Sequence, residues 1–299
     1  MQLGFIGLGK MGKNMVLRLL EHNIQVVAWN RSSDDLDEVA AKGATPASSV
    51  EDVAAKLEGQ RFIWLMLPNG APTDEILGKL LPTLRKGDVV IDGANSLYVD
   101  TLRRAKQLEA AGIELVDIGV SGGPGGARNG ACLMIGGAKD TVTKLEPVIL
   151  ALSAPGAFAH FGPTGSGHFA KMVHNGIEYG MMQAIAEGAA VLQKSPFGYY
   201  LAQVFHLYNQ RSVIESRLVE WTENALKENP TLADVSSTIA HTGEGEWTIN
   251  AAKELGVDVP VIETSYQVRV KSGNEPESFR NKVVSALRGQ FGGHATKKA

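Results

Sequence analysis

The chain contains a single cysteine, Cys132, and no apolar run long enough to cross a membrane. One cysteine excludes an internal disulfide, and its scarcity fits a reducing compartment. The net charge is −3, so no basic excess favours nucleic acid as a partner. The first residues lack the basic region of a signal peptide. We therefore expect a cytoplasmic protein without a membrane partner.

Metal-ligand spacings are also missing. The seven histidines show no HExxH pattern, and no Cys/His cluster has the spacing of a zinc site. We predict no metal. The length of 299 residues instead favours about two domains with substantial cores.

A glycine-rich turn follows the apolar run at residues 2–6 and precedes a segment with helical periodicity. This order and spacing predict a dinucleotide-binding turn. Gly7 would allow the tight turn, Gly9 the approach of the pyrophosphate, and Gly12 close helix packing. The predicted cofactor contacts in the turn are Gly7, Leu8, Gly9, Lys10, Met11 and Gly12.

The end of the next expected strand, residues 24–29, indicates which nicotinamide cofactor is preferred. An NAD site usually has an acid here for the ribose hydroxyl, whereas this chain has Asn30, Arg31, Ser32 and Ser33. Arg31 and Ser32 suit a 2′-phosphate, so we favour NADP and keep NAD open. The alternative is a turn in which Ser32 or Ser33 caps the following helix.

Strands and helices then alternate, which predicts an α/β fold: a Rossmann-type doubly wound parallel sheet over residues 1–163. From residue 164 long helical periodicities predict an all-helical C-terminal domain, residues 164–299. Its helices are expected up to residue 272, and the tail from residue 289 is expected to be irregular. Ligands of such sheets bind beyond the carboxyl ends of the strands. There we expect Leu67, Pro68 and Asn95 to contact the cofactor.

The loop after the strand at residues 113–118 contains Ser121, Gly122 and Gly123. Consecutive free amides beside a hydroxyl could cradle a carboxylate, because such backbone forms an anion-binding nest. The alternative is a flexible glycine-rich loop.

A helical segment at residues 171–179, KMVHNGIEY, has polar side chains at converging positions. Lys171, His174, Asn175 and Glu178 fall on about a third of the helix circumference. The face combines a base, two hydrogen-bonding groups and an acid. Apolar residues occupy the other sides, so we expect the helix inside the protein with its polar face toward a cavity: Met172, Val173, Ile177, Met181 and Met182. Taken alone, it also fits an ordinary surface helix.

Residues 119–137, GVSGGPGGARNGACLMIGG, together with KMVHNGIEY, closely resemble the signature stretches of the decarboxylating 6-phosphogluconate dehydrogenases. The resemblance covers essentially the whole chain at the length of the family's short form, within the β-hydroxyacid dehydrogenase superfamily. It implies oxidation and decarboxylation of 6-phosphogluconate in the pentose phosphate pathway. Lys171 would be the general base and Glu178 the acid.

The resemblance also implies a substrate site. Arg269 would bind the phosphate, and Arg288 and His294 would reach into the partner subunit's site, which implies a homodimer. The residues that would hold the sugar acid are Asn95, Ser121, Gly122, Gly123, His174, Asn175 and Tyr179. One departure is clear: where the long form has KGTGKW, this chain has Thr242 and Glu244 in place of a lysine and a threonine that contact phosphate.

Two other functions stay open. One is a related 3-hydroxyacid dehydrogenase that does not release carbon dioxide, although such relatives are not expected to combine His174, Glu178, Arg288 and His294. The other is a non-catalytic NADP-binding sensor, because fold alone does not establish function. The chemistry of the first assignment needs a neutral lysine and a protonated glutamate, which an enclosed site can supply.

Overall fold

The structure is a computed structural model that describes residues 1–292 and 296. The chain forms two compact units, Met1–Met172 and Val173–Ala299. The predicted domain division lies shortly before the N-terminus of the long helix α9 (Ser166–Lys194), and the two units divide within that helix. Within the described part of the chain, no helix is long and apolar enough to cross a membrane.

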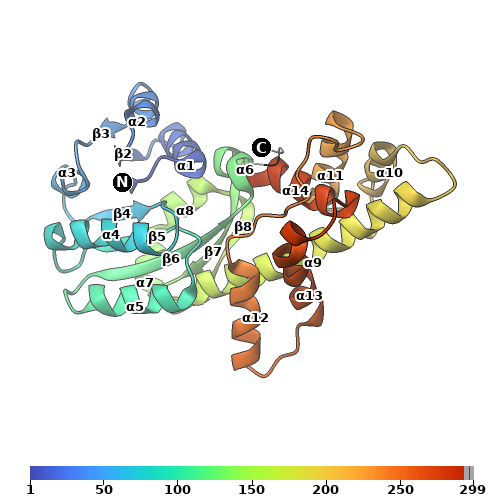
Figure 1. The fold of residues 1–299 in the computed structure, drawn as a ribbon. Helices are drawn as coiled ribbons and strands as arrows, with labels where there is room; N and C mark the ends of the chain where they lie inside the picture. Colours follow the sequence, from blue (N-terminus) through green and yellow to red (C-terminus); the bar gives the residue numbers. More distant parts are fainter. Residues whose placement is uncertain (293–295, 297–299) are drawn as a thin grey trace. The chain divides into compact units, whose positions relative to one another are not determined.

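The first unit is built on an eight-stranded sheet in the order β3-β2-β1-β4-β5-β6-β7-β8 (Figure 1). The prediction of a parallel sheet is wrong at one pair, because β7 runs antiparallel to β6. The seven-residue helix α6 joins these two strands, and parallel neighbours need a longer crossover. The strands are β1 (Gln2–Ile6), β2 (Gln25–Trp29), β3 (Thr45–Pro46), β4 (Phe62–Leu65), β5 (Val89–Asp92), β6 (Glu114–Ser121), β7 (Ala131–Gly136) and β8 (Ser153–Gly162).

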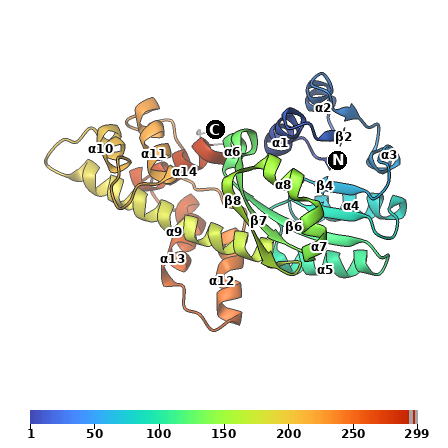
Figure 2. The same cartoon turned by 180° about the vertical axis from the view of Figure 1, so that it is seen from behind.

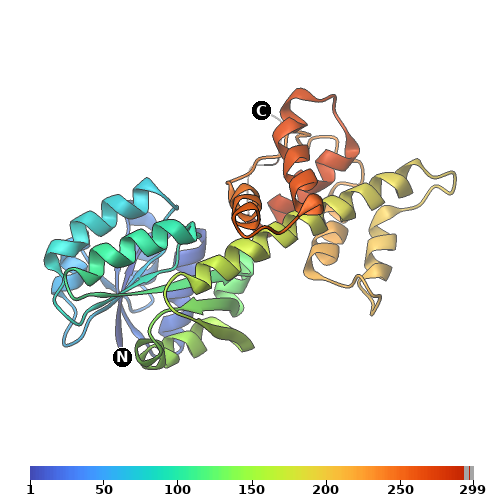
Figure 3. The same ribbon diagram turned by 90° about the horizontal axis from the view of Figure 1, so that it is seen from below.

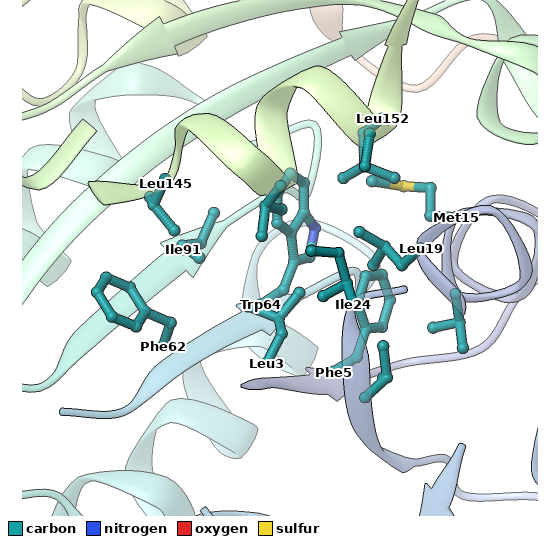
Figure 4. Close-up of a cluster of buried hydrophobic side chains, with 14 of the residues drawn as sticks. Leu3, Phe5, Met15, Leu19, Ile24, Phe62, Trp64, Ile91, Leu145 and Leu152 are labelled. Carbon is teal, nitrogen blue, oxygen red and sulfur yellow. The ribbon is translucent and has the colours of Figure 1, made fainter. Parts of the chain in front are cut away.

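Helices cover both faces of this sheet, which confirms the doubly wound α/β prediction. On one face Met15 and Leu145 pack around Trp64, whose ring stacks on Phe5 at 6.0 Å between centroids (Figure 4). On the other face Leu77 belongs to a separate apolar cluster. The helices are α1 (Lys10–Glu21), α2 (Ser33–Ala40), α3 (Val50–Ala55), α4 (Ala71–Leu80), α5 (Tyr98–Glu109), α6 (Gly123–Asn129), α7 (Lys139–Lys144) and α8 (Glu146–Leu152), with a 3-10 turn at Leu81–Thr83.

The second unit is all-helical in its described residues, as predicted. Helix α9 is one continuous helix of 29 residues (Figure 3). Met182, Phe205 and Leu287 share the core of the unit, in which α10, α11 and α14 lie together (Figure 2). The remaining helices are α10 (Leu201–Tyr208), α11 (Arg217–Glu228), α12 (Glu244–Glu254), α13 (Pro260–Lys271) and α14 (Phe279–Gly292), with a 3-10 turn at Ser272–Asn274.

Helix α14 differs from the sequence-based expectation, which left this segment unassigned and treated the tail from residue 289 as irregular. The structure continues the helix through Gly292. Val283, Val284 and Leu287 are buried along it, so the helix is fixed by its apolar face.

Candidate active site

The glycine turn between β1 and α1 has the geometry that the spacing predicted. Gly7 has a φ of +100°, and a Cβ on it would lie 2.3 Å from the carbonyl oxygen of Met66 and 2.9 Å from the Leu67 side chain. A Cβ on Gly12 would lie 2.0 Å from the Gly7 carbonyl oxygen, so α1 packs as close as glycine allows. Gly9 has open space around it. The turn is therefore closed on the protein side and accessible where a pyrophosphate would bind.

Helix α1 follows the glycine turn, and the first turn of this helix contains no acidic residue. Lys10 and Met11 are its first residues, and Lys10 is exposed. Unpaired amides and the helix dipole at such an end favour an anion. These residues fit a dinucleotide.

The end of β2 holds the glycine turn in place. The Asn30 side-chain oxygen accepts a hydrogen bond from the Leu8 amide at 2.9 Å, and Asn30 Nδ2 donates to Ser32 Oγ at 2.9 Å. Ser32 stands at the N-cap of α2, but its side chain makes no capping bond. The Ser32 capping alternative is therefore wrong, and exposed Arg31 and Ser32 stay available to a ligand.

The loops after β4 and β5 are joined by a buried arginine that sequence reasoning missed. Arg104, which is 1% exposed, donates to Asp92 Oδ2 at 3.1 Å, Ser96 Oγ at 2.9 Å and the Gly70 carbonyl at 3.2 Å. These bonds hold the loop that contains Asn95 beside the loop that follows Leu67 and Pro68. A signal existed, because Arg104 lies on the same face of its helix as buried Thr101 and Leu108.

Ser121 is the last residue of β6, and the chain then turns sharply into α6. Gly122 and Gly123 have φ values of +130° and +61°, which favour glycine. Both are partly exposed, as is Ser121. This segment is a turn at the carboxyl end of a strand, and its role as a carboxylate cradle stays a prediction.

Helix α9 begins on strands β6 and β7 through contacts that only glycine permits. A Cβ on Gly167 would lie 2.5 Å from the Met134 carbonyl oxygen. Buried Asp117 accepts hydrogen bonds from the amides of Gly165 at 2.6 Å and His168 at 2.7 Å, which satisfies donors at the helix N-terminus.

Lys171 lies in the second turn of α9, and its side chain passes directly over Gly119 of β6. A Cβ on Gly119 would lie 2.4 Å from Lys171 Cβ. Lys171 is 8% exposed, and Gly119 stands two residues before Ser121. The structure thus encloses the predicted base beside the strand that leads to the predicted carboxylate cradle.

Farther along α9, His174, Asn175 and Glu178 form a connected polar group in the second unit. His174 Nδ1 lies 3.1 Å from Asn175 Oδ1 and 3.9 Å from Glu178 Oε2. Asn175 is 8% exposed. The predicted polar face is therefore partly buried, as expected, but Ile177 and Met181 beside it are exposed rather than packed inside.

Tyr179 and Arg269 form a buried stacked pair. The guanidinium carbon of Arg269 lies 3.4 Å from the centroid of the Tyr179 ring, a cation–π contact. Arg269 is 3% exposed, and its Nη1 has no hydrogen-bond partner among the described residues. Burial lowers the pKa of Arg269 to about 10 and raises the pKa of Tyr179. A buried cation with an unused donor is suited to an anionic ligand.

One further predicted residue, Arg288, lies near this pair. Arg288, in α14, is 6% exposed and acts electrostatically on both Tyr179 and Arg269 of its own chain. His294 lies outside the described residues. Across residues 1–292 and 296, no group of three His, Cys, Asp or Glu side chains could hold a metal ion.

Comparisons with known proteins agree with this geometry. The NAD binding domain of 6-phosphogluconate dehydrogenase matches residues 2–162, and the C-terminal domain of 6-phosphogluconate dehydrogenase matches residues 167–298. A Bacillus subtilis protein that bears the provisional name 6-phosphogluconate dehydrogenase is 41% identical over 100% of both chains. The NAD(+)-dependent, decarboxylating 6-phosphogluconate dehydrogenase of Haloferax volcanii is 40% identical over 98% of both chains.

A solved structure is also similar. The Plasmodium falciparum 6-phosphogluconate dehydrogenase, studied in apo form and with NADP+ or 6-phosphogluconate, matches with a TM-score of 0.82 and 29% identity. The match covers 96% of this chain and 70% of that chain. Two domain families in the expected order and relatives over the full length confirm the resemblance, and the chain belongs to the 6-phosphogluconate dehydrogenase family.

Proposed function

We propose that the protein oxidises and decarboxylates 6-phospho-D-gluconate to D-ribulose 5-phosphate and carbon dioxide, with reduction of NADP or NAD. The observation that supports this most strongly is the enclosure of Lys171 against Gly119 on the helix that also holds Glu178. Family membership supplies the substrate, and the side chains supply a base and an acid.

Lys171 acts first in this proposal. In its neutral form the amine takes the proton of the C3 hydroxyl, and the dinucleotide that the glycine turn would hold would supply the acceptor for the hydride of C3. The resulting 3-keto acid loses its carboxylate as carbon dioxide, and the electrons of the broken C1–C2 bond move toward the C3 carbonyl. The protonated Lys171 returns its proton to that oxygen and stabilises the charge that develops on it.

Glu178 completes the reaction by protonating the carbon left behind, which becomes C1 of the product, while Lys171 takes back the proton of the enol hydroxyl as the ketone forms. His174 lies beside both Asn175 and Glu178, and His174 and Asn175 would hydrogen-bond the substrate hydroxyls. Asn95, Ser121 and the amides of Gly122 and Gly123 would orient the sugar acid carboxyl end. Tyr179 would also hold the sugar acid, and Arg269 would bind the phosphate. Arg288 and His294 would reach into the partner subunit's site.

For the cofactor we propose a preference for NADP. No carboxylate stands at the end of β2, where an NAD site usually has one, and Arg31 and Ser32 are exposed there. The contacts proposed for the dinucleotide are Gly7, Leu8, Gly9, Lys10, Met11, Gly12, Asn30, Arg31, Ser32, Leu67, Pro68 and Asn95. A 40% identical relative is NAD(+)-dependent, so NAD stays the alternative.

We also propose a cytoplasmic homodimer. Ile177 and Met181 form an exposed apolar stripe on α9, and Val191 on the same helix is 72% exposed. Large apolar side chains exposed along one helix favour an interface. Sedimentation of the full chain tests the dimer, and a monomer at micromolar concentration would contradict it.

The experiment for the function is a comparison of initial rates with 6-phosphogluconate and 3-hydroxyisobutyrate, each with NADP and with NAD. We expect turnover of 6-phosphogluconate and formation of ribulose 5-phosphate. Turnover of the short hydroxy acid alone would favour the non-decarboxylating alternative. Cofactor binding without turnover of any sugar acid would favour the sensor.

A further inference from the structure

Glu244 is a buried carboxylate at the start of α12, although acidic residues at helix ends usually face water. It is 7% exposed, and its Oε2 accepts a hydrogen bond from Thr242 Oγ1 at 2.7 Å. The neighbouring Gly243 has a φ of +103°, which sets the turn that leads into the helix. The carboxylate is therefore held in one position by its own loop.

Two glycines bring this carboxylate against α9. A Cβ on Gly245 would lie 2.6 Å from the ring of Tyr179, and a Cβ on Gly176 would lie 2.6 Å from Thr248. Because neither position has room for a side chain, α12 packs directly on α9 at the turn that presents Tyr179. Glu244 lies one residue before Gly245, and its carboxylate acts electrostatically on Tyr179.

The charged groups that act on the stacked pair of Tyr179 and Arg269 come from several helices of the second unit. Arg288 of α14 acts on both residues, and Glu178 of α9 acts on Arg269. Glu244 interacts electrostatically with both Tyr179 and Arg269. Its negative charge offsets part of the positive charge to which an anionic ligand would bind.

We propose that Glu244 is a specificity-determining residue that weakens the binding of a doubly charged phosphate at Arg269, and so reduces the preference for phosphorylated over unphosphorylated sugar acids. This inference depends on the proposed function, because it assigns the phosphate of 6-phosphogluconate to Arg269. A like charge close to a bound anion costs affinity, and burial strengthens the effect.

The charge of the ligand makes the inference specific. A phosphate monoester carries nearly two charges above its second pKa of about 6 and one charge below it. The repulsion from Glu244 should therefore be strongest at about pH 8 and weaker at about pH 6. A purely structural role of Glu244 would not follow the ionisation of the ligand.

The test is isothermal titration of the full-length protein with 6-phosphogluconate and with gluconate, for wild type and Glu244→Gln. Glutamine keeps the shape and an acceptor for Thr242, so only the charge is lost. We expect the Kd for 6-phosphogluconate to fall by about tenfold at about pH 8 and by less at about pH 6. The Kd for gluconate should change by less than about twofold, because it has no phosphate.

The matched control is Glu246→Gln, which removes the same charge from the same helix turn at an exposed position. An unchanged Kd in Glu244→Gln, or an equal fall in Glu246→Gln, would overturn the inference. Glu244→Thr is the second variant, and it should tighten binding in the same way if glutamine disturbs the fold. Binding of 6-phosphogluconate without turnover by the wild type would instead contradict the proposed function and leave the Glu244 comparison measurable.

Discussion

The side chain of Lys171 lies over Gly119 so closely that a Cβ at position 119 would stand 2.4 Å from the Cβ of the lysine. Real Cβ contacts are never this short, so Gly119→Ala must move either α9 or the lysine. A displacement of about 1 Å can cost about a hundredfold in rate. We expect kcat to fall by about that factor, with a smaller change in cofactor affinity.

Gly78→Ala is the control for this substitution. Gly78 lies in α4, is exposed and has open space around it. Alanine there should raise stability by up to about 1 kcal/mol and leave kcat unchanged. Steady-state kinetics and thermal unfolding of both variants measure these effects. A wild-type kcat in Gly119→Ala would show that position 119 has room for a side chain beside Lys171.

Glu178→Gln removes the proposed acid and keeps the size of the side chain. General acid catalysis contributes about a hundredfold to ten-thousandfold, so kcat should fall within that range. Glu187→Gln, an exposed site on the same helix, should have no effect. Release of carbon dioxide at the wild-type rate by Glu178→Gln would show that another group is the acid.

Arg31→Ala tests the cofactor preference. A hydrogen bond to a charged group contributes about 1.5–3 kcal/mol, so kcat/KM with NADP should fall by about tenfold to a hundredfold. The same parameter with NAD should change little, because NAD lacks the 2′-phosphate. Equal losses with both cofactors would assign Arg31 a general role in the fold.

Arg104→Met tests whether the buried arginine holds the two loops of the first unit. The substitution removes the guanidinium that pairs with Asp92, a carboxylate that is only 1% exposed. Breaking a buried ion pair in this way lowers the free energy of unfolding by about 3–5 kcal/mol. Arg103→Met, the exposed neighbour, should cost less than about 1 kcal/mol. Chemical denaturation measures both, and equal costs would contradict the role of Arg104.

The ion pair between Arg104 and Asp74 leads us to expect that the stability of the fold depends on pH. Burial alone would raise the pKa of Asp74, but hydrogen bonds from Arg104 and Arg103 bring it below its usual value. Because the pKa of Asp74 is lower in the folded than in the unfolded protein, its ion pairs contribute their full stabilisation above about pH 4, the usual pKa of Asp. That stabilisation is lost as the pH falls through the lowered pKa of the folded state. Acid titrations of unfolding should therefore show a smaller loss in Arg104→Met than in the wild type.

The architecture could be predicted from local patterns, since the glycine turn and the α9 periodicity each specify one backbone geometry. The polar face at residues 171–179 was visible for the same reason. The antiparallel β7 was not, because strand direction depends on the length of the short α6 connection. Helix α14 was missed because its apolar face is interrupted by buried polar residues such as Asn281 and Ser285.

The features of the site that could not be predicted from the sequence share one physical cause. Arg104, Asp117 and Gly119 act through contacts with residues distant in sequence, and only the folded sheet brings these together. Glu244 was recognised as a departure from the family pattern. Its burial against Tyr179 depends on the two glycines that bring α12 and α9 together.

The most direct measurement is the ratio of carbon dioxide released to nicotinamide reduced during turnover of 6-phosphogluconate by the wild type and by Lys171→Met, with exposed Lys194→Met as control. The account predicts one carbon dioxide per reduced nicotinamide in the wild type and in Lys194→Met, and loss of both products in Lys171→Met. Reduced nicotinamide without carbon dioxide, or full activity without Lys171, would contradict it.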